Sequence, residues 1–152
     1  MADTPTQKQC EASVRALARL HAHWWDSPSF GGDDFPIPRD KALDEITFVY
    51  STDYREFSGY LGDRLSQSRR EIYEKSLEKL PSLLKKRLKN STQLTLAHGN
   101  AHHWNILLPK ADGEVVIFDW QTWHVDVRTH DLTYLMGVWW FSEHRELQRL
   151  RV

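Results

Sequence analysis

The sequence predicts an α+β fold that is mainly helical and carries one small β-hairpin. Over roughly the first ninety residues, apolar side chains recur at steps of three and four, the spacing of amphipathic helices. Further along, two short apolar runs flank an Asp-Gly pair, which is a hairpin signal. The chain has 152 residues, of which 40% are hydrophobic and 27% charged, so it can bury a core as one soluble globular domain.

The first helix is expected at residues 11–25. Its apolar positions, such as Leu17, recur along one face, and His21 is the polar exception on that face. Ser27-Pro28 ends this helix, because proline cannot continue the backbone hydrogen bonding. Residues 27–40 are rich in Pro, Gly and Asp and predict an ordered loop.

Helical spacing then resumes and continues almost to residue 90. Ser66 and Ser68 offer N-caps, and Pro81 can open a short helix, because its missing N–H is tolerated in a first turn. The expected helical segments are residues 43–50, 54–65, 66–80 and 81–88.

The β-forming part follows residue 90. A short strand is expected at 94–96, and the two apolar runs at 106–108 and 115–118 predict a hairpin. Folding this hairpin brings Asn105, just before its first strand, beside Asp119, just after its second. Two oxygen-bearing side chains then share one end of the ribbon.

Composition and charge exclude several functions. Twenty Lys and Arg against 21 Asp and Glu leave a formal charge of -1, which argues against a general nucleic-acid or anionic-membrane binder. The apolar segment at 132–141 is half the length that a membrane span needs, and it predicts a buried helix. The first residues lack the pattern of a signal peptide, so we expect a cytoplasmic protein. Cys10, the only cysteine, permits no internal disulfide.

The most informative stretch runs from His98 to Trp120. In protein kinases, a catalytic-loop Asp is followed five residues later by a metal-binding Asn, and a second metal-binding Asp follows a short hairpin. Here Asn100, Asn105 and Asp119 occupy the same order. Carboxylate and amide oxygens suit Mg²⁺, although Asn and Asp beside strands are also ordinary turn residues.

These residues resemble the aminoglycoside phosphotransferase and choline-kinase-like family. Its signature is His-Gly-Asp-x-His-x-x-Asn followed by Ile-Asp-Trp or a close variant. Residues 17–25 also resemble the family's first long C-terminal-lobe helix, and Asp131-Leu132 its later Asp-Leu pair. The signature positions that match are His98, Gly99, His102, Asn105, Asp119 and Trp120.

The resemblance implies a protein-kinase-like C-terminal lobe over residues 11–152, preceded by a tail at 1–10. It implies transfer of the γ-phosphoryl group of ATP, with Mg²⁺, to a hydroxyl of a small molecule. It assigns no nucleotide-binding residue. Its implied roles are the catalytic position for Asn100, metal binding for Asn105 and Asp119, and support of the loop for His98, His102 and Asp131.

Two departures from the family bear on activity. Asn100 stands where the family has its catalytic Asp, and an amide cannot accept a proton from a hydroxyl. Only about ten residues precede the first helix, too few for the Gly-rich N-terminal lobe that covers the phosphates, and the C-terminal end also comes early. We therefore expect the chain alone to be inactive, and its exposed apolar surface near the first helix and the hairpin to favour self-association or docking of a missing lobe.

Other interpretations stay open at this point. The second interpretation is a noncatalytic remnant or binding module that keeps the fold. His98, His102 and His103 also raise the possibility of a zinc hydrolase, although Gly99 and Asn100 between them favour a loop. A set of acidic residues offers a cleft for a cationic acceptor or, alternatively, ordinary solvated loop carboxylates: Asp26, Asp33, Asp34 and Asp126.

Overall fold

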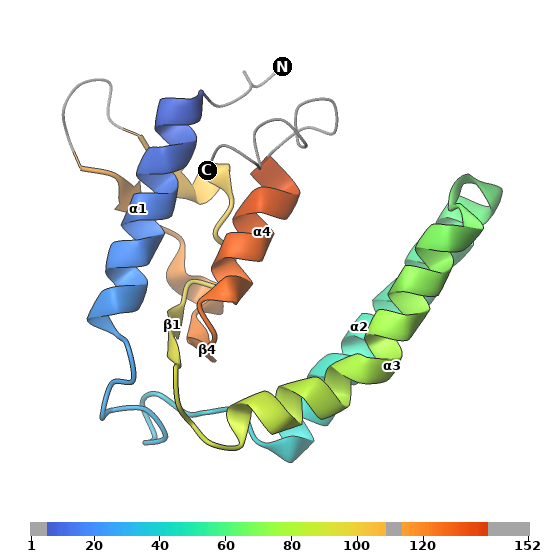
Figure 1. Cartoon of the computed structure of the whole chain (residues 1–152), viewed down its shortest axis with the longest axis horizontal. Helices are drawn as coiled ribbons and strands as arrows, with labels where there is room; N and C mark the ends of the chain where they lie inside the picture. The colour runs from blue at the N-terminus through green and yellow to red at the C-terminus, as the bar shows by residue number, and fades with distance from the viewer. Residues whose placement is uncertain (1–5, 109–113, 140–152) are drawn as a thin grey trace. The chain divides into compact units, whose positions relative to one another are not determined.

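The computed structural model describes residues 6–108 and 114–139, which form helices and small antiparallel sheets (Figure 1). The chain divides into two compact units, one built from residues 1–36 and 93–152 and the other from residues 37–92. In the described part of the chain, no helix combines the length and the hydrophobicity needed to span a membrane.

The first unit begins with α1, Gln7–His23. This helix starts four residues before the expected boundary, because Thr6 and Gln9 form a reciprocal capping box with each other's backbone. Residues 7–10 are thus helical, and Cys10 is buried instead of lying in a polar tail. The helix ends two residues before the expected end, at a C-cap formed by Trp24.

Two short antiparallel sheets follow α1 in this unit. β1, Thr95–Ala97, pairs with β4, His124–Asp126, in the register Leu96 to Val125. β2, Ile106–Leu107, pairs with β3, Val116–Ile117. This second pair confirms the predicted hairpin, whose Asp-Gly turn lies outside the described residues, whereas β4 is a strand that the sequence did not predict.

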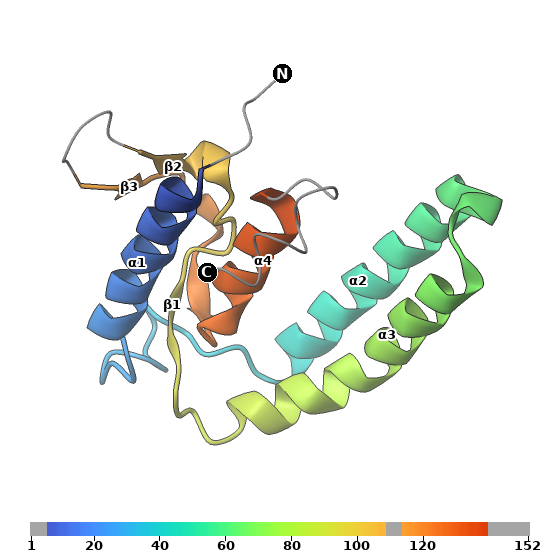
Figure 2. The same ribbon diagram turned by 45° about the horizontal axis from the view of Figure 1, so that its top comes forward.

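The core of this unit lies between α1, the hairpin and the last described helix, α4, Thr129–Trp139. Buried side chains from all of these elements meet there, and the β2–β3 ribbon lies next to α1 (Figure 2). The predicted buried helix corresponds to α4, and its last two expected residues lie outside the described range. The central buried residues are Leu17, Ala101, Ile106 and Leu135.

The loop after α1 is held by aromatic packing, as expected for an ordered loop. Trp24 stacks on Phe30 at 6.2 Å between ring centroids and also contacts Phe35, which reaches Trp123 at 5.5 Å. Such ring contacts add to the burial of large aromatic surfaces. These residues therefore tie the loop to the segment after β3.

The second unit is an α-helical hairpin of α2, Asp40–Leu61, and α3, Gln67–Leu88, joined through the 3₁₀ turn η1, Gly62–Arg64. Its aromatic face includes Tyr54 and Tyr73, whose rings lie 5.4 Å apart. α2 and α3 lie side by side along their length (Figure 1).

Two expectations for this unit are wrong. Residues 43–50 and 54–61 belong to one helix, α2, in which Ser51 and Thr52 hydrogen-bond to carbonyls of the preceding turn, and residues 62–64 form η1. Pro81 opens no new helix; it lies inside α3, where packing against α2 offsets the lost backbone hydrogen bond. Ser66 does occupy the N-cap of α3, but its hydroxyl pairs with that of Ser68 and caps no backbone amide.

Candidate active site

The candidate site is built on the loop between β1 and β2. Gly99 begins its turn with φ of +81°, a conformation that side chains rarely adopt. A Cβ at this position would lie 2.3 Å from the carbonyl oxygen of Thr122. The loop therefore passes so close to the segment before β4 that only glycine fits there.

Asp131 anchors this loop from the first turn of α4. Its side chain is fully buried, and its two oxygens accept hydrogen bonds from the backbone N–H of His98 at 2.8 Å and of Gly99 at 2.9 Å. His21 of α1 contacts the same carboxylate through Nε2 at 2.9 Å. Burial alone raises the pKa of Asp131, but these three hydrogen bonds outweigh burial and lower it. The contact expected between Asp131 and residues 98–100 is thus present.

His98 links the loop to the end of the hairpin. Its Nε2 donates to the carbonyl of Phe118 at 2.9 Å, and its Nδ1 accepts from the N–H of Asn100 at 3.3 Å. Its own carbonyl accepts from the hydroxyl of Thr122, and its ring packs edge-on against Trp120 at 4.8 Å. Both ring nitrogens are used within the fold, which is the arrangement of a structural strut.

Asn100 is held through its backbone. Its N–H donates to His98, while its carbonyl accepts from the N–H of His102 at 2.9 Å and from Nδ2 of Asn105 at 3.0 Å. These contacts fix the turn around position 100 and leave the Asn100 side chain out of the network. A change of that side chain therefore need not disturb the loop.

Asn105 and Asp119 lie at the same end of the β2–β3 ribbon. The N–H of Phe118 donates to the carbonyl of Asn105 at 3.1 Å, which extends the pairing by one step. Asn105 is buried and uses Nδ2 for its contacts with Asn100 and His102, so its amide oxygen is engaged in neither. Asp119 is exposed and has φ of +65°, a left-handed conformation in which Asp is tolerated better than most residues.

His102 and His103 follow on the other side of Asn100. The ring of His102 lies edge-on to Trp104 at 5.3 Å and faces Tyr134 of α4 at 6.2 Å. Its Nδ1 is buried with no hydrogen-bond partner among the residues described. The ring of His103 packs on Trp104 at 4.0 Å. Burial lowers the pKa of His103, and neighbouring His102 adds to this effect.

The zinc interpretation of these histidines finds no support. His98 would have to give up the hydrogen bond that its Nδ1 accepts from the Asn100 N–H to bind a metal through that atom. Within residues 6–108 and 114–139, one group of three potential metal-ligating side chains lies close together. It consists of His124, Asp126 and His130. This group lies in β4 and at the start of α4.

The acidic residues proposed for a cleft do not act together. Asp26 accepts from the N–H of Leu94, and its own N–H donates back to the Leu94 carbonyl, so it ties the loop to β1. Asp126 contacts the two histidines named above. Asp33 and Asp34 are exposed loop residues. Asp26 is thus structural, Asp33 and Asp34 are solvated, and Asp126 is paired with two histidines.

From the sequence, no role was assigned to His21, His124 or His130, and Asp126 was considered only for an acidic cleft. His21 was visible as the polar residue on the buried face of α1, but its partner lies 110 residues away. The signal for the second group was the close spacing of His124, Asp126 and His130 directly before Asp131. Neither the position of His21 nor the spacing of the three residues identifies a contact until the fold is known.

An Asn before a hairpin and an Asp after it follow the order of the metal-binding residues in protein kinases. The model of the Phosphotransferase enzyme family (APH) matches residues 1–152, so the chain belongs to this family. Comparison with curated proteins and with solved structures gives no significant match.

Proposed function

We propose that the chain supplies the catalytic segment of a phosphotransferase that moves the γ-phosphoryl group of ATP to a hydroxyl of a small molecule. The observation that carries this proposal is the loop that Asp131 anchors, with Asn105 and Asp119 at the adjoining end of the hairpin. Phosphoryl transfer depends mostly on positioning and on charge neutralisation, and this arrangement is suited to both.

The donor set fits Mg²⁺. Asn105 offers a neutral amide oxygen, because its nitrogen is committed to Asn100, and Asp119 offers an exposed carboxylate. Hard oxygen ligands of this kind are those that Mg²⁺ prefers. Bound there with ATP, Mg²⁺ would neutralise charge on the phosphates. The chain's own contribution is to hold both side chains at the end of one short ribbon.

The other residues position the loop. His98 hydrogen-bonds to the carbonyl of Phe118, just before Asp119, and so connects the loop to the end of the hairpin. Asp131 holds the turn at Gly99 by accepting a hydrogen bond from the Gly99 N–H. His102 follows Asn100, with its ring beside Tyr134. These contacts keep position 100 in a defined place relative to Asn105.

Asn100 favours a second candidate function, a noncatalytic nucleotide-binding module of the same fold. An amide orients a hydroxyl but cannot accept its proton, and the loss of a general base costs on the order of 10²–10⁴-fold in rate. Moreover, none of the four strands in the described part of the chain carries a lysine for the phosphates.

Steady-state ATP consumption over a panel of hydroxyl acceptors tests both candidates. The native chain and Asn100→Asp are compared, each with and without a grafted N-terminal lobe. With the lobe, we expect Asn100→Asp to turn over on the order of 10²–10⁴ times faster, with nucleotide affinity changed only a few-fold. Equal rates for the two forms would contradict the role of position 100.

Nucleotide binding separates the candidates further. We expect Asp119→Ala to weaken Mg²⁺-ATP binding, whereas Asp34→Ala, which removes an exposed loop carboxylate, leaves it unchanged. Binding without turnover in every form favours the noncatalytic module. Equal binding by the native chain and Asp119→Ala would remove Asp119 from the metal site.

A further inference from the structure

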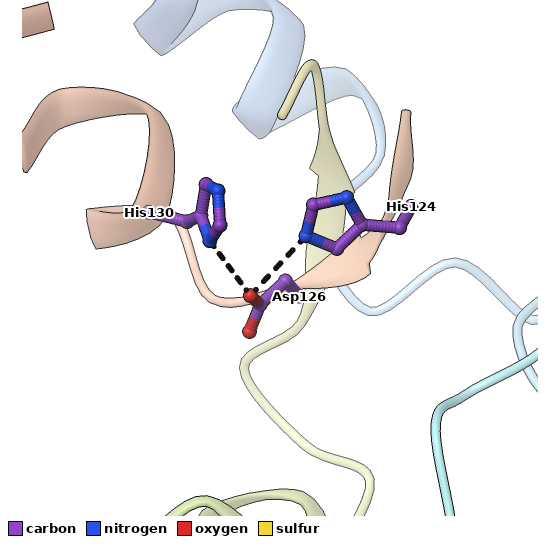
Figure 3. A group of neighbouring side chains, drawn as sticks. All are labelled: His124, Asp126 and His130. Atoms are coloured by element: carbon purple, nitrogen blue, oxygen red, sulfur yellow. Dashed lines mark hydrogen bonds and ion pairs between the residues drawn. The ribbon is translucent and has the colours of Figure 1, made fainter. Parts of the chain in front are cut away.

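A second group of polar side chains lies behind the loop. His124 and Asp126 come from β4, two residues apart and so on one face of the strand, and His130 comes from the first turn of α4. Figure 3 shows both rings directed at the carboxylate of Asp126. Its Oδ2 lies 3.4 Å from Nε2 of His124 and 3.1 Å from Nδ1 of His130.

In its neutral form, the His124 ring has no hydrogen to donate from Nε2 to Asp126. Nδ1 of His124 lies 2.9 Å from the carbonyl oxygen of Thr122, so Nδ1 carries a hydrogen and donates. In the neutral ring, Nε2 then presents a lone pair to the Asp126 carboxylate, which is also electron-rich. A proton or a metal ion between these two atoms removes that repulsion.

The Asp126 carboxylate lies within ion-pair distance of both rings. Burial by itself raises the pKa of Asp126, but its contacts with the His124 and His130 rings and a hydrogen bond from the N–H of Val127 hold it well below its usual range. The hydrogen bond to Asp126 in turn raises the pKa of His124. By residue type and geometry, the group offers one carboxylate oxygen and two imidazole nitrogens.

We propose that His124, Asp126 and His130 bind a divalent transition-metal ion of the zinc type. The ligand atoms are Nε2 of His124, Oδ2 of Asp126 and Nδ1 of His130, and a fourth position stays open to water. With metal–ligand distances of about 2.0–2.2 Å in a tetrahedral site, neighbouring ligand atoms lie roughly 3.3 Å apart. Both carboxylate–imidazole distances are close to this value, and all three ligand atoms lie within 4.8 Å of one another.

The surroundings match a metal site in two further respects. A metal-binding histidine commonly donates its other ring N–H to a carbonyl, as His124 does to Thr122. The three side chains are 35%, 16% and 27% exposed, in the order His124, Asp126, His130, so an ion can enter from solvent. Two imidazoles and one carboxylate favour Zn²⁺, Co²⁺ or Ni²⁺ over Mg²⁺, so this site differs in chemistry from the one at the hairpin.

The site joins β4 to α4 behind the loop. The ring of His124 lies 3.1 Å from the point where a Cβ on Gly99 would be, and His130 directly precedes the anchoring residue Asp131. A metal ion bound here connects β4 to α4, the helix that contains the anchoring residue Asp131. The inference does not depend on phosphoryl transfer, because its readouts are metal binding and stability.

The test uses the full chain without a histidine tag, stripped of metal with a chelator, and titrated with Zn²⁺ by calorimetry. We expect one tight equivalent and, at about 100 times Kd, a rise in Tm of roughly 5–10 °C. His130→Gln and Asp126→Asn should each weaken binding by at least about tenfold. The matched control is His23→Gln, which replaces an exposed histidine of α1 and should bind like the native chain.

Two readouts on the native chain do not depend on a variant that folds. Co²⁺ should give the ligand-field absorption of a four-coordinate site, and Zn²⁺ should shift the imidazole NMR signals of His124 and His130 while leaving His23 unchanged. The proposal is overturned by the absence of Zn²⁺ binding up to about 1 mM, by shifts confined to other histidines, or by full competition from Mg²⁺. In those cases the group is an ion pair only.

Discussion

Replacement of Asp131 by Asn tests the anchoring of the loop with a minimal change of shape. The carboxylate is fully buried and accepts from the N–H groups of His98 and Gly99 and from His21. Asn keeps one oxygen, so one of the three donors then faces an NH₂ group and is left unpaired. A hydrogen bond to a charged group contributes about 1.5–3 kcal/mol, and an unpaired buried donor costs about 1–3 kcal/mol. We therefore expect a loss of about 3–5 kcal/mol.

Tryptophan fluorescence during urea unfolding measures this loss in the right part of the chain. All seven Trp residues lie outside residues 37–92, so their emission reports the unit that contains Asp131. The control is Asp34→Asn at an exposed position, which should stay within about 0.5 kcal/mol of the native chain. Hydrogen exchange adds a local readout: the amides of His98 and Gly99 should exchange faster in Asp131→Asn. A loss below about 1 kcal/mol with unchanged protection of both amides would refute the anchoring role.

The lowered pKa of Asp131 adds a pH signature to the same comparison. A carboxyl group whose pKa is lower in the folded chain contributes stability above its unfolded pKa of about 3.9, and this contribution is lost as the pH falls through the folded value. The native chain should therefore lose stability more steeply below about pH 4 than Asp131→Asn does. Parallel acid profiles would contradict the assignment.

Three further outcomes are expected. Gly99→Ala should destabilise the first unit by more than about 2 kcal/mol in the fluorescence assay, because its φ is positive and its Cβ would meet the Thr122 carbonyl; a neutral effect would mean that the loop sits elsewhere. Pro81→Ala should stabilise the α2–α3 hairpin by roughly 1–3 kcal/mol in circular-dichroism melts, since it restores a helix N–H, and a loss of stability would contradict this reason. Leu107 and Val116 face each other across the hairpin at 58% and 53% exposure, so the chain should self-associate in sedimentation experiments and Leu107→Ser should reduce it; a native monomer at all concentrations would count against it.

The features that the sequence predicts well are local. The hairpin follows from two β-forming runs and an Asp-Gly turn within about a dozen residues, and α1 follows from its periodic apolar face. The order of Asn100, Asn105 and Asp119 is also readable, because these residues lie on one loop and one ribbon. Family membership follows from this same order and agrees with the match over the whole chain.

The features that the sequence did not predict depend on which faces meet. Pro81 is a helix-opening residue by local propensity, but α3 runs through it because its packing against α2 outweighs one hydrogen bond. β4 is too short to show a strand pattern and exists because it pairs with β1.

The difference between local features and features set by tertiary packing is clearest for side-chain contacts. The loop, the hairpin and the order of Asn100, Asn105 and Asp119 along them can be read from the sequence. Only the tertiary structure decided that His21 meets Asp131 across 110 residues, and that His124, Asp126 and His130 converge on one point. The physical reason is that turn chemistry and side-chain period act within a few residues, whereas these contacts depend on how α1, β4 and α4 pack around a shared core.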